Sequence, residues 1–161
     1  MCETSAQVGV IRALQAFRGI GFLSAVTIVA EVGSLRSFRT APQLMAYAGV
    51  VPTEASSGSK QHRGPITKSG NSLLRHVLGE AAHHARHPPR VSSTLQQRQE
   101  HLPREVIDLA WRAQVRLHFR YRHLAGRIGV HKALTAVSRE VAGFVWALGQ
   151  ALEEVPIAAA A

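Results

Sequence analysis

The residues of this chain best suited to chemistry gather in one stretch, residues 50–71, with the sequence VVPTEASSGSKQHRGPITKSGN. Ser56 and Ser57 precede Gly58 there. A serine on a glycine turn can approach a phosphorus atom closely, while backbone N–H groups hold the developing oxyanion. Side chains that can carry positive charge follow at Lys60, His62, Arg63 and Lys68. We interpret the stretch as an active-site loop for a phosphodiester; a solvated basic loop is the alternative.

The loop leads into a predicted helix that begins at Asn71 or Ser69 and runs to about Arg86. The first N–H groups of a helix are unpaired and carry partial positive charge, so Gly70 and Asn71 make a suitable anion site. Arg75, one turn into the helix, would face the same anion. The spacing is not that of a P-loop, because the lysine comes one place too early.

Two further helices are predicted before the loop, at residues 6–17 and 22–32, separated by a Gly-x-Gly turn. Two short helices joined in this way are typical of a helix-hairpin-helix. In that motif Gly19 and Gly21 would let backbone N–H groups hold a DNA phosphate without reading sequence. A plain turn between two helices is the alternative.

Helical periodicity covers most of the remaining chain, so we expect a mainly α protein. A short helix is predicted from the Thr40–Gln43 capping box to Gly49. The loop after it either lacks regular structure or holds a short β-hairpin. The expected division is a helix start at 1–11, a core at 12–87, a linker or mobile segment at 88–103 with a helical turn near 95–101, a C-terminal helical part at 104–152 and a tail at 153–161.

The C-terminal part should contain two long helices, at about residues 104–124 and 132–152. A buried stripe is predicted on the first, made of Ile107, Trp111, Val115 and His118 or Phe119. Trp146 is expected in the core as well. Arg112, Arg116 and Arg120 repeat every four residues on the same helix. Such a row can follow a nucleic-acid backbone, although a solvated face would look the same.

The net charge of +9, from 19 Lys and Arg against 10 Asp and Glu, indicates a polyanionic partner. Nucleic acid is the most frequent one and an anionic membrane surface a less frequent one. No apolar run approaches the ~18 residues that a membrane span needs, and the N-terminus does not resemble a secretory signal. Cys2 is the single cysteine. We therefore expect a soluble, cytoplasmic protein.

The acidic residues limit the possible metal chemistry. Asp108 is the only aspartate, and the other nine acids are scattered glutamates. Two-metal phosphoryl transfer needs several carboxylates around ions about 3.5–4 Å apart. His83 and His87 have an i, i+4 spacing, but no further ligand is suitably placed. The prediction is that this chain holds no metal and no cofactor of its own.

The order of the motifs along residues 12–152 resembles a known family. The matching segments are Phe17–Gly21, Ala30–Gly33, Ala46–Gly49, Val51-Pro52, Ser57-Gly58, Gly64–Asn71, Leu74-Arg75, Lys132-Ala133, Ala136–Arg139 and Val145-Trp146. Together they are similar to the C-terminal domain of the insertion-sequence one-ten class of transposases, which includes one-sixteen and nine-oh-two. These enzymes are recombinases guided by a bridge RNA.

The resemblance implies a serine that attacks a DNA phosphodiester and becomes joined to the strand. Ser57 matches that position, and Ser56 is its neighbour to be tested beside it. The charges of Lys60, Arg63 and Lys68 suit phosphates around it. In this family a RuvC-like domain adds a DEDD carboxylate set and Mg²⁺, a structured guide RNA selects the DNA, and the enzyme acts as a homo-oligomer at the nucleoid.

We expect neither a RuvC-like domain nor a DEDD set in this chain. We therefore expect a truncated transposase that is not active alone. The alternative is a nucleic-acid-binding remnant of a decayed mobile element, without catalysis.

Overall fold

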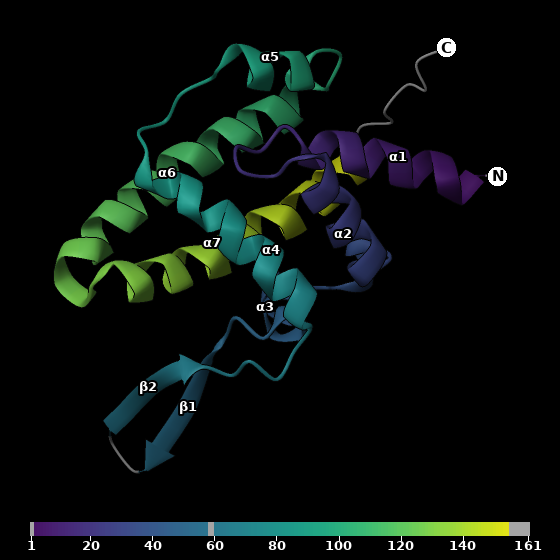
Figure 1. Cartoon of the computed structure of the whole chain (residues 1–161). Helices are drawn as coiled ribbons and strands as arrows, with labels where there is room; N and C mark the ends of the chain where they lie inside the picture. The colour runs from purple at the N-terminus through teal and green to yellow at the C-terminus, as the bar shows by residue number, and fades with distance from the viewer. Residues whose placement is uncertain (1, 58–59, 155–161) are drawn as a thin grey trace.

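The computed structural model describes residues 2–57 and 60–154; for residues 2–5, 54–63 and 153–154 it describes the backbone alone. The elements in chain order are α1 (Cys2–Leu14), α2 (Phe22–Val32), the 3₁₀ turn η1 (Leu35–Ser37), α3 (Ala41–Ala48), β1 (Pro52–Ser57), β2 (Lys60–Ile66), α4 (Ser72–His83), the 3₁₀ turn η2 (His84–Arg86), α5 (Ser93–Gln99), α6 (Arg104–Ile128) and α7 (Val130–Glu154). The prediction of a mainly α fold is confirmed (Figure 1).

Helix α7 lies at the centre of the packing and contacts α6, α4, α3 and α1 (Figure 1). Its buried residues recur at helical spacing: Ala133, Val137, Val141, Ala142, Val145 and Leu148. This apolar stripe gives the other helices a common surface to cover. α6 and α7 form a long antiparallel pair, and the chain reverses between them at Gly129, whose φ of +87° suits glycine.

Most helix boundaries follow local signals. α2 has the predicted bounds. α1 ends at Leu14 instead of residue 17, and Ala16 and Phe17 are buried in the turn that follows it. Asn71 caps α4, as predicted: its side-chain oxygen accepts the N–H of Leu74 at 2.8 Å. The Gln43 half of the predicted capping box is present too, with the N–H of Thr40 donating to Gln43 Oε1 at 3.4 Å.

The segment at 88–103, predicted as a linker with a helical turn, contains α5. Leu95 of this helix is buried, and Gln99 Nε2 donates to the carbonyl of Ala16 at 3.1 Å. Near its start, Arg18 donates to the carbonyl of Pro88 at 2.7 Å. These contacts hold the segment against the turn between α1 and α2.

The predicted buried face of α6 is wrong at Trp111 and Phe119, whereas His118, the other alternative at the end of the stripe, is buried. The buried residues are Val106, Leu109, Ala110, Ala113, Gln114 and His118, while Trp111 is 44% exposed and Phe119 68% exposed. Both apolar sets recur at helical spacing, so the sequence alone did not distinguish them. The side chains that meet α7 and η2 are the smaller ones, because alanines let the helices approach closely. Trp146 is partly buried and donates to the carbonyl of Phe38 at 2.8 Å.

Candidate functional site

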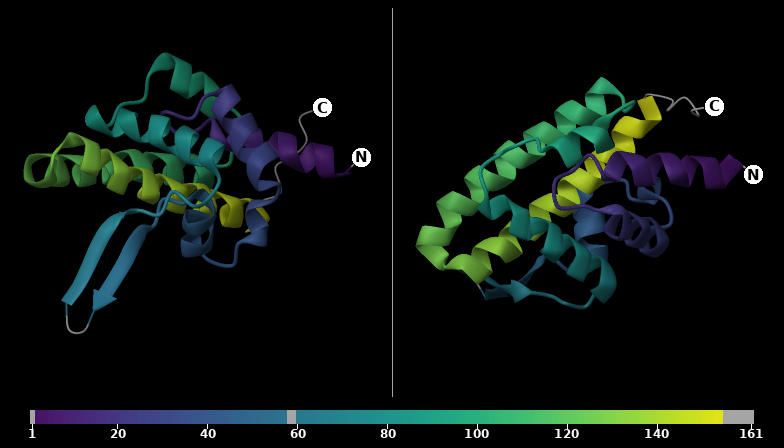
Figure 2. Two further views of the ribbon diagram at one scale, coloured as in Figure 1. Left: turned by 60° about the horizontal axis from the view of Figure 1, so that its bottom comes forward. Right: turned by 45° about the horizontal axis from the view of Figure 1, so that its top comes forward.

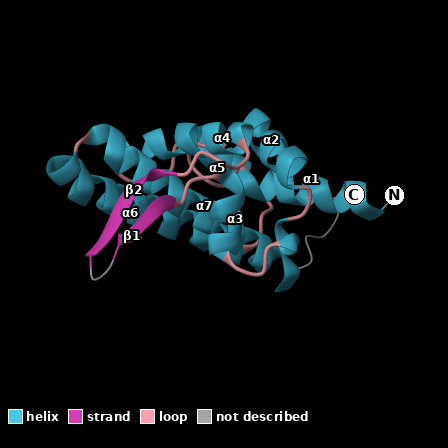
Figure 3. Ribbon diagram, turned by 90° about the horizontal axis from the view of Figure 1, so that it is seen from below, coloured by secondary structure: helices cyan, strands magenta, loops and turns pink. Residues whose placement is uncertain are grey.

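The predicted active-site loop forms an antiparallel β-hairpin that projects from the helical body (Figures 2 and 3). The hairpin alternative for this loop is thus confirmed. β1 ends at Ser57 and β2 begins at Lys60, and these two residues are paired in the register, as are Ser56 and Gln61. The side chains of Ser56, Ser57, Lys60 and Arg63 lie outside the described residues, so their predicted roles stay predictions.

The register of the hairpin is irregular near its base. Pro52 pairs with Ile66 and Glu54 with Arg63, so that Thr53 stands opposite two residues, Gly64 and Pro65. Such a β-bulge tolerates proline, which cannot donate to a ladder. A Cβ on Gly64 would lie 2.2 Å from Thr53 Oγ1. The hydroxyl of Thr53 donates to the carbonyl of Pro65 at 2.9 Å. This bond joins the two strands at the bulge near the base of the hairpin.

The hairpin is anchored by a close backbone approach between its exit and the end of α3. Asn71 N–H donates to the carbonyl of Tyr47 at 2.7 Å, and Lys68 N–H to that of Gly49 at 3.2 Å. A Cβ on Gly70 would lie 2.2 Å from the carbonyl oxygen of Tyr47 and 2.4 Å from the nitrogen of Gly49. Only glycine fits at such a distance. The Gly70-Asn71 pair therefore has a structural role at this joint.

Arg75 lies at the same joint. Its NH1 donates to the carbonyls of Ala48 at 3.1 Å and of Gly70 at 3.4 Å. The predicted phosphate ligand is thus also a tie between α4 and the C-terminal end of α3. Glu31 of α2 completes the joint, because it accepts bonds from Asn71 Nδ2 and from the hydroxyl of Tyr47.

Lys68 is placed differently from Arg75. It is exposed, and its φ of +53° is unusual for a residue other than glycine. The strained backbone lies where the chain leaves the hairpin and turns toward α4. A lysine head at this point can reach a polyanion that approaches the hairpin base.

The arginine row of α6 meets an acid that the sequence analysis did not pair with it. Arg116 Nε lies 3.1 Å from Glu140 Oε2 on α7, and Arg120 Nε lies 3.0 Å from Glu140 Oε1. The second contact lacks the alignment of a hydrogen bond. Glu140 is 17% exposed. One carboxylate thus holds two guanidinium groups, and the cluster keeps a positive charge.

This cluster lines an open groove of about 880 Å³ at the foot of the hairpin. Val51 and Pro52 form its hairpin side, and Arg139 and Phe144 of α7 lie in its wall. Arg139 has no ion-pair partner within the described ranges. Arg112, exposed on α6, also has none there. The groove therefore presents positive charge next to the strand that carries the serines.

The two glycines of the predicted helix-hairpin-helix differ in their surroundings. Gly19 has a φ of +92° and packs on α4, where a Cβ would lie 2.8 Å from the carbonyl oxygen of Ala81. Gly21 precedes α2 and has open space around its Cα. The close approach that requires Gly19 is thus made to the protein itself. Phosphate binding at this turn stays a prediction.

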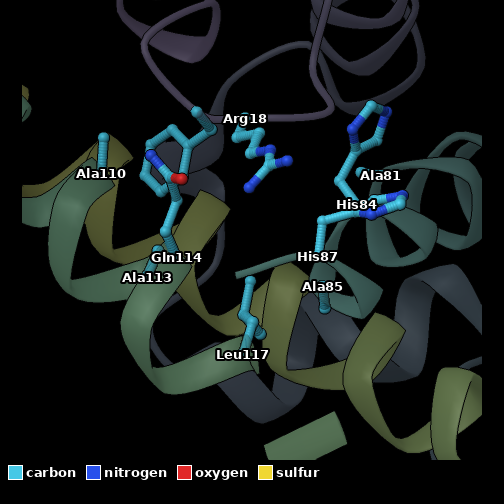
Figure 4. A pocket seen from close by; sticks show the side chains of 10 residues that line it. Arg18, Ala81, His84, Ala85, His87, Ala110, Ala113, Gln114 and Leu117 are labelled. Atoms are coloured by element: carbon cyan, nitrogen blue, oxygen red, sulfur yellow. The ribbon is translucent and has the colours of Figure 1, made fainter. Parts of the chain in front are cut away.

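A small pocket of about 20 Å³ lies beside Gly19, large enough for a single water (Figure 4). Arg18, His84, His87 and Gln114 line it. Partial burial lowers the pKa of His84, and the positive charge of Arg18 lowers it further, followed by His87 and His83. Of the residues that the structure describes, no three His, Cys, Asp or Glu are grouped to hold a metal ion.

The comparison with known proteins decides the family. A family model described as "Transposase IS116/IS110/IS902 family" matches residues 11–96, which include the hairpin and its anchoring joint. The chain belongs to this transposase family. The resemblance deduced from the sequence is thereby confirmed.

Two relatives show how much of a family member the chain represents. It is 44% identical over 142 residues to a Sinorhizobium fredii protein named "Putative transposase y4qE", covering 88% of this chain and 36% of the relative. It is 40% identical over 65 residues to the "Transposase for insertion sequence element IS1111A" of Coxiella burnetii, covering 40% of this chain and 18% of the relative. The transposase-family chain thus spans about a third or less of these curated relatives. In its described ranges, no helix has the length and apolarity for a membrane span.

Proposed function

We propose that this chain is the part of a DNA transposase that supplies a serine nucleophile for strand exchange, and that Ser57 is that nucleophile. The observation that carries the proposal is the projecting hairpin, in which β1 ends at Ser57 opposite Lys60. The close backbone contact between Gly49 and Gly70 holds the base of the hairpin against the helical body. A serine near the end of an extended hairpin can reach a phosphorus atom in a DNA backbone, which a serine on a packed helix cannot.

The chemistry would be a transesterification. Ser57 Oγ attacks the phosphorus and gives up its proton to a base, while one sugar oxygen leaves with its bonding electrons and takes up a proton. The strand is then joined to serine as a phosphodiester. A hydroxyl of a second DNA end attacks the same phosphorus and releases the serine, so no external energy source is needed. The cations of Lys60, Arg63 and Lys68 would balance the charge on the phosphoryl oxygens.

The groove at the hairpin base indicates the side of the molecule from which DNA would approach Ser57. Arg116, Arg120 and Arg139 line it, and Pro52 is both its wall and the first residue of β1. Arg112 adds charge on the same helix as Arg116. We infer that the DNA backbone runs along this groove toward the hairpin. These contacts would position DNA without reading its sequence.

This chain does not fit a two-metal site. Its single aspartate, Asp108, is exposed at the start of α6 and pairs with Arg104 at 3.0 Å. We therefore propose that any Mg²⁺ is held by carboxylates of a separate RuvC-like domain, and that this chain acts only after such a domain joins it. The same proposal includes binding of a structured guide RNA, assembly into a homo-oligomer and a location at the nucleoid in the cytoplasm.

The test is capture of the covalent intermediate. The chain is combined with a full-length relative whose own serine is replaced, with its RNA and with end-labelled DNA, and the products are resolved on a denaturing gel. We expect labelled DNA on this chain, lost completely in Ser57→Ala and kept in the matched control Ser69→Ala, an exposed serine beyond the hairpin. An adduct that survives Ser57→Ala but not Ser56→Ala would move the role to Ser56.

The second candidate is nucleic-acid binding without catalysis. It is favoured by the arginine-lined groove, because Arg116, Arg120 and Arg139 can hold phosphates whether or not a serine reacts. It predicts salt-sensitive DNA binding that survives Ser57→Ala. The absence of an adduct in every reconstitution would favour this function.

A further inference from the structure

Two aromatic side chains stand out from the surface of α6. Trp111 is 44% exposed and Phe119 is 68% exposed, with the half-buried Val115 between them at four-residue spacing. Eight residues of helix separate the two rings by about 12 Å along the axis. They form one outward row, which we call the aromatic row.

The aromatic row is not a by-product of core packing. α6 buries its opposite side, including Ala110 and Ala113, against α7 and η2. α6 runs along one long edge of the molecule (Figure 2). The ring of Phe119 meets the ring of His118 edge-on, with 6.4 Å between the centroids, and most of it lies in water, so a partner that covered it would gain free energy from burial.

Cations surround the aromatic row. Arg116 and Arg122 lie three residues before and after Phe119, and Arg112 follows Trp111; all three arginines are exposed. Two of the nearby acids are already paired, Asp108 with Arg104 and Glu140 with Arg116, and Glu105 is exposed at the start of the helix. The face therefore combines flat apolar rings with net positive charge. An apolar protein surface would not match that charge.

We propose that the aromatic row binds an unpaired DNA strand, with bases stacked on Trp111 and Phe119 and phosphates held by the flanking arginines. Stacking on aromatic side chains together with a basic track is the usual way to hold a single strand without sequence preference. A duplex cannot use the row, because its base faces are covered by their neighbours. The inference rests on the proposed function, since strand exchange creates unpaired DNA.

The position of Arg116 supports DNA as the source of the strand. Arg116 belongs to the flank of the aromatic row and also to the groove at the hairpin base. A strand that leaves the hairpin through the groove would continue past Arg116 to Phe119. The row thus extends the path proposed for the DNA that Ser57 attacks.

The test uses the whole chain and fluorescently labelled oligonucleotides: a 15-mer of dT, a 15-mer of rU and a 15-base-pair duplex. Phe119→Ala and Trp111→Ala should each weaken binding to dT by at least about fivefold, while duplex binding stays within about twofold. Phe119→Tyr should bind as the unmodified chain does. The matched control is Leu23→Ala, which removes a side chain 78% exposed on α2 and should change nothing.

Each other outcome overturns the inference in a recognisable way. Equal losses on dT and duplex would mean that the row is not a stacking surface. A loss confined to rU would assign it to RNA. A wild-type dimer in sedimentation velocity that Phe119→Ala converts to monomer would assign it to a second copy of the chain. An unmodified chain that binds no oligonucleotide would overturn the inference, whereas the proposed function is tested separately by the covalent adduct in the reconstituted system.

Discussion

Arg120 Nε lies 3.0 Å from Glu140 Oε1, at the point where α6 and α7 face the foot of the hairpin. The same carboxylate also holds Arg116. The Glu140 carboxylate thus competes with any bound phosphate for the guanidinium groups of Arg116 and Arg120. An acid in this position tunes the affinity of the groove for nucleic acid.

Glu140→Gln should raise the affinity for DNA, because both arginines lose their carboxylate and one negative charge leaves the groove. We expect a gain of several-fold at low salt and a steeper salt dependence, by about one unit in the log–log slope. Fluorescence anisotropy with duplex DNA at several salt concentrations measures both. Glu80→Gln, an exposed acid on α4, is the control for net charge alone. An equal gain in that control would contradict the specific role of Glu140.

Gly70→Ala should destabilise the fold, since the new Cβ would meet the backbone of Tyr47 and Gly49 at 2.2–2.4 Å. We expect a loss of more than about 2 kcal/mol in the free energy of unfolding. Gly79→Ala is the matched control on α4, because a Cβ there meets nothing within 4 Å. That change should stabilise by about 0.5–1 kcal/mol through helix propensity. Urea denaturation of both variants checks the opposite signs.

Arg75→Ala and Arg112→Ala should separate structural from binding arginines. Arg75→Ala leaves the carbonyls of Ala48 and Gly70 without this donor, so we expect a loss of about 1–3 kcal/mol in unfolding free energy. Arg112 is exposed, and its removal should change stability by less than about 0.5 kcal/mol. It should instead weaken DNA binding. Similar melting behaviour of the two variants would argue against the structural role of Arg75.

Acidification should destabilise the protein through His84. Its pKa in the folded state is lowered, first by partial burial against the Gly19 turn and then by Arg18, so the unfolded chain binds the proton more readily. The neutral form favours folding at pH above the ordinary histidine value of about 6.5. That stability is lost as the pH falls through this value toward the folded-state pKa.

Unfolding free energies measured between pH 7.5 and 5 for the unmodified protein and for His84→Gln test this pH dependence. The variant should show a shallower decline than the unmodified protein. Leu73→Gln, a change at an exposed residue of α4 that does not titrate, should keep the original slope. A slope unchanged in His84→Gln would show that other groups carry the pH dependence.

The sequence by itself determined the features that depend on neighbouring residues. Asn71 was predicted as a possible start of α4 and is its N-cap, and the predicted inward residues of α4, such as Leu74 and Leu78, are buried. The apolar pattern also predicts the bounds of α2, Phe22–Val32, as they are found. Capping bonds and helical periodicity operate within a few residues, so they can be read without the fold. The order of motifs also determined the family, which the family model confirmed.

The tertiary structure alone decided which surfaces meet. α6 carries two apolar rows, and only its packing on α7 shows that the alanine-rich row is inside and that Trp111 and Phe119 are outside. Glu140 is 24 residues from Arg116 in the chain, so their pairing could not be read from local spacing. Arg75 and Gly70 meet the carbonyls of α3 for the same reason. Such contacts depend on how helices distant in sequence settle around a shared core, where close packing selects one face of each.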